Sequence, residues 1–196
     1  MTVSLLRGSV GGLVLGAIAR GWMRAIATDP EFTWGGTLAI VIGFGIFGLT
    51  QSLALQARRR PRGWRLSAAR VVGVVGLVPL FGAAGAALAP TVIFGALAVA
   101  RVGWPRWARA IAGLVAAVPL GWVLWDVVGA VGDTPLRAAV GIVGILATYA
   151  VVIRVAATAT LAPRADGYRL PKPVRVGAAV ASAGFFATAL VAGGIN

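Results

Sequence analysis

The chain has 196 residues, of which 59% are hydrophobic and 12% are charged, and its mean hydropathy is +0.92. Soluble domains average about 45–50% apolar and about 25% charged residues. The composition therefore excludes an ordinary water-soluble domain and predicts an all-α integral membrane protein. A net charge of +13 suggests a nucleic-acid partner at first sight. The basic residues flank apolar runs, however, where the positive-inside bias accounts for them, so we expect no nucleic acid.

Cysteine and histidine are both absent from the sequence. Their absence excludes disulfides, thiolate nucleophiles, imidazole bases and the usual zinc, haem or iron–sulfur ligand sets. The serines have no histidine base, and no glycine-rich phosphate loop follows a predicted strand. We therefore expect no catalytic residues, no cofactor and no metal site. A carboxylate-based reaction at Asp126 is the enzymatic alternative.

Apolar runs long enough to cross a bilayer recur along the chain. A helix needs about 20 apolar residues to cross a hydrocarbon core of about 30 Å. We predict a single polytopic domain, 1–196, with about seven spans at residues 5–27, 33–55, 67–87, 90–100, 108–131, 135–155 and 174–195. The fourth span is short, and residues 71–100 could alternatively form one long tilted helix.

The first span has two further features. Arg7 followed by the apolar run 8–19 is typical of a secretory signal, but the arginines directly after that run favour a retained span. Its residues Gly8, Gly12 and Gly16 form a Gly-xxx-Gly face, which lets another helix approach closely. That helix could belong to this chain, to a second copy or to a different protein.

The distribution of charge decides between the two topologies. With seven spans, all but three of the 18 basic residues lie on one face, accompanied by a single acid, Asp166. The other face receives the remaining charges: Arg20, Arg24, Arg137, Asp29, Glu31, Asp126 and Asp133. Merging the third and fourth spans would scatter the basic connections over both faces. The positive-inside rule therefore predicts seven spans with a cytoplasmic N-terminus and an extracytoplasmic C-terminus, and the composition favours a bacterial plasma (inner) membrane.

A faint internal repeat accompanies this layout. Gly63-Trp64-Arg65-Leu66 is echoed by Gly167-Tyr168-Arg169-Leu170, and Gly21-Trp22 is echoed by Gly121-Trp122, at offsets of about 100 residues. A three-plus-one-plus-three parallel repeat, of the kind that places transporter sites at the repeat interface, is one explanation. Chance matches in a sequence rich in glycine, alanine and valine are the other.

The charged layer on the outer side contains the candidate site residues. Arg20 lies about 20 Å along the helix from Arg7 at about 1.5 Å per residue, which is some 10 Å below the outer boundary of a core of about 30 Å. Arg24 and Asp126 come out near that boundary. Because a charge at membrane depth is costly unless it is paired or hydrated, we predict an outward-facing vestibule in which Arg20 and Arg24 face Asp126. Its rim consists of Asp29, Glu31, Asp133 and Arg137.

The alternative interpretation of this layer is purely structural. The charges would then form ion pairs with one another and reach into the lipid headgroups. Polar residues within other spans, namely Thr50, Gln51, Thr148 and Tyr149, are expected to form hydrogen bonds between helices. Pro79 and Pro119 are expected to kink their spans, and Pro90 to open the short fourth one.

Two functions follow from these features. The first is permeation of a small solute or ion, in particular an anion, through the charged vestibule. The second is a non-catalytic accessory or assembly subunit of a larger membrane complex, which the small size and the scarcity of soluble loops favour. The expected partners are the lipid bilayer and either another membrane protein or further copies of this chain.

Overall fold

The structure, a computed structural model, describes residues 2–27, 33–59, 63–84, 86–131 and 134–163. All regular structure in these ranges is helical, and the predicted last span at 174–195 lies outside them. The elements are α1 (Thr2–Ile26), α2 (Trp34–Arg59), α3 (Gly63–Val75), α4 (Leu77–Ala84), the 3-10 turn η1 (Ala86–Leu88), α5 (Ala89–Ala100), α6 (Arg106–Val131) and α7 (Pro135–Ala159).

Four helical stretches are long and apolar enough to cross a membrane: Trp34–Arg59, Trp64–Gly82, Arg106–Val131 and Pro135–Ala159. They confirm the prediction of an all-α chain with membrane-spanning helices. The helical segment Ala86–Ala100 is apolar but shorter, and it contains the short fourth span predicted at 90–100.

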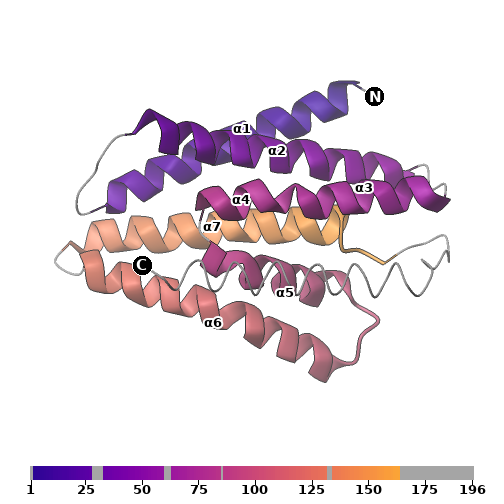
Figure 1. The fold of residues 1–196 in the computed structure, drawn as a ribbon. Helices are drawn as coiled ribbons and strands as arrows, with labels where there is room; N and C mark the ends of the chain where they lie inside the picture. The colour runs from indigo at the N-terminus through magenta and orange to yellow at the C-terminus, as the bar shows by residue number, and fades with distance from the viewer. Residues whose placement is uncertain (1, 28–32, 60–62, 85, 132–133, 164–196) are drawn as a thin grey trace.

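Successive helices run back and forth through the bundle, as Figure 1 shows. α1, the pair α3 and α4, and α6 run in one direction, while α2, α5 and α7 run in the opposite one. Because α4 and α5 are antiparallel, residues 71–100 do not form one long helix. The alternation collects arginines at one end of the bundle, here called the basic end: Arg7, Arg58, Arg59, Arg65, Arg70, Arg101, Arg106, Arg109 and Arg154.

Prolines interrupt or begin helices at two of the expected places. α3 and α4 form one helix that is broken at Gly76. Pro79 has no backbone N–H, so the carbonyl of Val75, four residues earlier, has no hydrogen-bond donor within the helix. Pro90 occupies the first turn of α5, where its missing N–H costs nothing. α6 continues through Pro119, and beside this proline the buried hydroxyl of Thr91 donates a hydrogen bond of 2.8 Å to the carbonyl of Ala116.

The core lies where α2, α4, α5 and α7 meet. The side chains of Phe44, Leu80, Val92, Ile145 and Val152 are each at most 1% exposed there. Close packing of this kind leaves little space between helices. α1 packs on one side of this core against α2 and α7, and α6 packs on the other side against α5 and α7 (Figure 1).

Glycines bring α1 and α2 into unusually close contact. A Cβ atom placed on Gly12 would collide with the backbone carbonyl of Phe44, and one placed on Gly48 would collide with the carbonyl of Gly8. On Gly16 it would lie 2.9 Å from the Cα of Val41. The Gly-xxx-Gly face of α1 is therefore occupied by a helix of the same chain, which answers the question left open by the sequence.

Candidate functional site

Arg20, the charge that the sequence places deepest in the predicted outer layer, has a half-buried side chain that bonds to α2. Its Nε donates a hydrogen bond of 3.2 Å to the hydroxyl of Thr37. That hydroxyl in turn donates to the carbonyl of Thr33 at 3.0 Å. Thr37 thus gives the guanidinium a neutral acceptor on the neighbouring helix. No pattern in the sequence singles out Thr37, although its place in the first turn of α2 puts it at the same end as Arg20.

Of the other predicted site residues, the structure describes Arg24, Arg137 and Asp126. Arg24 is exposed near the end of α1, Arg137 is exposed in the first turn of α7, and Asp126 is exposed on α6. Near these residues, Ile26 of α1 and Val127 of α6 both lie against Gly141 of α7. Within the ranges that the structure describes, Asp126 forms no ion pair, and the vestibule in which both arginines face Asp126 stays a prediction. The rim residues Asp29, Glu31 and Asp133 lie outside those ranges.

A tryptophan between Arg20 and Arg24 links α1 to α7. The indole N–H of Trp22 donates a hydrogen bond of 3.1 Å to the hydroxyl of Thr148, which is 126 positions away in the sequence. A Cβ atom on Gly144 would collide with the Trp22 ring, so the ring lies directly against the backbone of α7. Thr148 therefore forms the expected bond between helices. The hydroxyl of Thr50 instead bonds carbonyls of its own helix, those of Ile46 and Phe47.

Arginines at the basic end bond the carbonyl groups that follow α7. Arg70 donates from Nε to the carbonyl of Thr160 at 2.7 Å and from Nη2 to that of Ala162. Arg58 donates to the carbonyls of Ala162 at 3.1 Å and Pro163 at 2.9 Å. Thr160 is the residue that ends α7. Carbonyls at a helix C-terminus lack partners within the helix and carry a partial negative charge, so a cation binds there favourably. These two arginines therefore fix the end of α7 as well as contributing to the charge bias.

Gln51 extends this connection into the buried interior. Its side chain is 1% exposed, and its Nε2 donates a hydrogen bond of 2.8 Å to the carbonyl of Gly73. Its Oε1 accepts a hydrogen bond from the hydroxyl of Thr160. A single amide on α2 thereby connects α3 with the end of α7. Interhelical bonding by Gln51 was predicted, but its partners were not.

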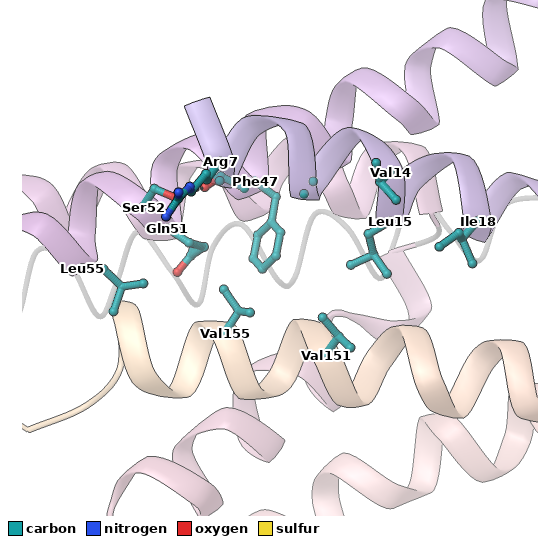
Figure 2. A pocket seen from close by; sticks show the side chains of 14 residues that line it. Arg7, Val14, Leu15, Ile18, Phe47, Gln51, Ser52, Leu55, Val151 and Val155 are labelled. Carbon is teal, nitrogen blue, oxygen red and sulfur yellow. Dashed lines mark hydrogen bonds between the residues drawn. The ribbon is translucent and has the colours of Figure 1, made fainter. Parts of the chain in front are cut away.

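A groove between α1 and α7, closed on one side by α2, combines polar and apolar walls. The part nearest the basic end has a volume of about 410 Å³. Figure 2 shows Arg7, Gln51 and Ser52 together at one end of this cavity, with apolar side chains along the remainder. A second cavity of about 570 Å³ continues the groove toward Trp22. Both cavities are lined by Leu15, Ile18 and Val151.

The fold and these sites define a class of protein, a helical bundle with four helices long and apolar enough to cross a membrane. No protein-family model, curated protein or solved structure matches the chain. Across the described ranges, no group of three or more Asp or Glu side chains could hold a metal ion. The groove and the outer charged layer are therefore the two candidate sites.

Proposed function

We propose that the chain is a non-catalytic accessory or assembly subunit of a larger membrane complex. The observation that carries the proposal is the filled interior, where Phe44, Leu80 and Ile145 are each 1% exposed at the junction of four helices. A permeation pathway through that junction would need space that these side chains occupy. A bundle with a filled interior acts through its outer surfaces.

The proposal includes the topology predicted from the charges. Seven spans would place the basic end in the cytoplasm of a bacterial cell and the C-terminus outside. The alternating directions of the described helices support it, because they gather the arginines at one end (Figure 1). The three-plus-one-plus-three repeat remains a prediction, since one of its two matched halves includes residues beyond 163.

α6 offers the surface that we assign to the partner. Of the four candidate spans it is the least buried, because only 11% of its apolar 18-residue stretch lies inside the bundle. Its large side chains at helical spacing are between 55% and 80% exposed: Trp107, Ile111, Leu114, Val118, Trp122 and Trp125. A helix face of this width fits either lipid or a helix of another protein. The proposed role requires the second.

The test is the composition of the protein purified gently from its own host, combined with a photo-crosslinking residue at Val118. We expect native mass spectrometry to show one other membrane protein in a fixed ratio, and that same protein to crosslink at Val118. The matched control is Leu38, which is 51% exposed on α2 and should not crosslink to it. A lone monomer, or equal crosslinking from both positions, contradicts the accessory role.

Permeation of a small solute or ion, in particular an anion, is the second candidate. The half-buried guanidinium of Arg20 favours it, because ionisable groups at membrane depth commonly mark ion pathways. Arg20 and Arg24 would supply fixed positive charge to the anion, and Asp126 a countercharge that the anion displaces. Asp29, Glu31, Asp133 and Arg137 would line the entrance.

Chloride flux into liposomes tests this second candidate. If Arg20 binds the anion, Arg20→Met should lower the flux by about tenfold or more, the factor that corresponds to ~1.4 kcal/mol of lost interaction. Arg106→Met removes an exposed charge from the basic end and should leave the flux unchanged. Equal flux through wild type and Arg20→Met, with both variants folded, rejects the vestibule.

A further inference from the structure

Arg7 lines the groove between α1 and α7, and its donors are available to a ligand. It is exposed at the basic end of α1, and it forms no hydrogen bond or ion pair with any residue that the structure describes. By contrast, Arg58 and Arg70 are bonded to carbonyls after α7, Arg109 donates to the carbonyl of Ala98 at 3.0 Å, and Arg20 donates to Thr37. Arg7 alone among these five lines the groove between α1 and α7.

The remaining walls of the same cavity offer almost nothing to a polar ligand. Ser52 donates its hydroxyl hydrogen to the carbonyl of Gly48 at 2.9 Å, and the Gln51 amide is bonded to α3 and to Thr160. Beyond them the lining is apolar, with Leu15 and Ile18 on α1 facing Val151 on α7 (Figure 2). The cavity is therefore amphipathic, with a cation at one end and a hydrocarbon surface along its length.

The length of the cavity matches one leaflet of a bilayer. From Arg7 to Ile18, α1 rises about 16 Å at about 1.5 Å per residue. Half of a hydrocarbon core of about 30 Å is about 15 Å. A molecule with its anionic head at Arg7 would therefore extend its apolar part to about the middle of the membrane.

We propose that this cavity binds one acyl chain of an anionic phospholipid, whose phosphate accepts hydrogen bonds from the guanidinium of Arg7. Basic pockets between transmembrane helices on the cytoplasmic side commonly bind anionic headgroups, and arginine binds phosphate through two parallel N–H donors. The lipid site stands independently of the accessory role, because α1, α2 and α7 line its cavity whereas the proposed partner surface is on α6.

Lipid titration of the delipidated full chain, followed by native mass spectrometry, tests the headgroup part. We expect one palmitoyl-oleoyl phosphatidylglycerol to bind more tightly than phosphatidylcholine with the same chains. Arg7→Gln should reduce that preference, the ratio of the two affinities, about fivefold, which corresponds to ~1 kcal/mol for one basic residue near an anionic group. Arg106→Gln deletes an exposed charge at the same end on α6 and is the matched control. Equal losses in both variants overturn the site.

Chain length tests the acyl part without altering the protein. Phosphatidylglycerol with six-carbon chains should bind at least about tenfold more weakly than the long-chain lipid, because its shorter chains bury fewer methylene groups in the cavity. Val151→Phe, which narrows the groove, should weaken both long-chain lipids while keeping the preference for phosphatidylglycerol. Equal binding of short and long chains overturns the proposal, as does unchanged binding to a folded Val151→Phe variant.

Discussion

Replacing Gly12 with alanine is expected to lower the free energy of unfolding by about 2 kcal/mol or more. In an exposed helix the same change usually stabilises by up to about 1 kcal/mol, because alanine loses less backbone entropy. Here the new methyl group would meet the carbonyl of Phe44 and lie 3.1 Å from the Cα of Gly45. Both obstacles are backbone atoms, which cannot rotate away, so α1 must move off α2 and forfeit contacts along its length.

Gly21 is the matched control on the same helix. It is exposed, and a Cβ atom there would meet nothing within 4 Å. Gly21→Ala should therefore be neutral or stabilising by up to about 1 kcal/mol. Unfolding in mixed micelles, followed by circular dichroism, gives both values. If Gly12→Ala proves as harmless as Gly21→Ala, the close packing of α1 on α2 is not a principal contact of the fold.

Gly12 also illustrates how much of the fold the sequence could predict. The Gly-xxx-Gly spacing predicted that some helix approaches α1, and the arginine distribution predicted that successive helices alternate in direction. Both predictions depend on sequence patterns that lie within one helix or on the difference in charge between its two ends. The short α5 was likewise predictable, because Pro90 and the basic residues after it mark its limits. The helix α1 and the broken α3–α4 helix begin and end within a few residues of the limits predicted for the first and third spans.

Side-chain partners could not be predicted in the same way. In a membrane, the surface facing lipid is as apolar as the interior, so hydropathy does not reveal how each helix is rotated. Trp22 and Trp122 illustrate this, since both lie near the outer ends of predicted spans. Trp22 bonds Thr148 inside the bundle, whereas Trp122 is 76% exposed on α6.

The candidate site depended on the same missing information. The depth of Arg20 was estimated from the rise of a helix, but its acceptor, Thr37, depends on how α1 and α2 are rotated against each other. The groove likewise exists only once α7 is placed beside α1, more than a hundred residues away in the sequence. Arg7 consequently appeared in the sequence as one topological charge among many.

Gln51→Leu is expected to lower the free energy of unfolding by about 2–4 kcal/mol. The substitution removes a buried amide that bonds the carbonyl of Gly73 and the hydroxyl of Thr160. A buried polar group left without its partner costs about 1–3 kcal/mol, and two groups are affected. The loss should appear in the same micelle unfolding experiment, with α2, α3 and the end of α7 no longer connected.

Two further variants separate this hydrogen-bond effect from simple repacking. Gln56 lies on the same helix, and its Nε2 is buried with no hydrogen-bond partner among the described residues. Gln56→Leu should therefore be neutral or stabilising. Adding Thr160→Val to Gln51→Leu replaces both members of one hydrogen bond by apolar groups. This costs far less stability than leaving one buried polar group without its partner. The double variant should therefore be more stable than Gln51→Leu alone. If it is less stable, Gln51 contributes through its volume, and the amide does not connect the helices energetically.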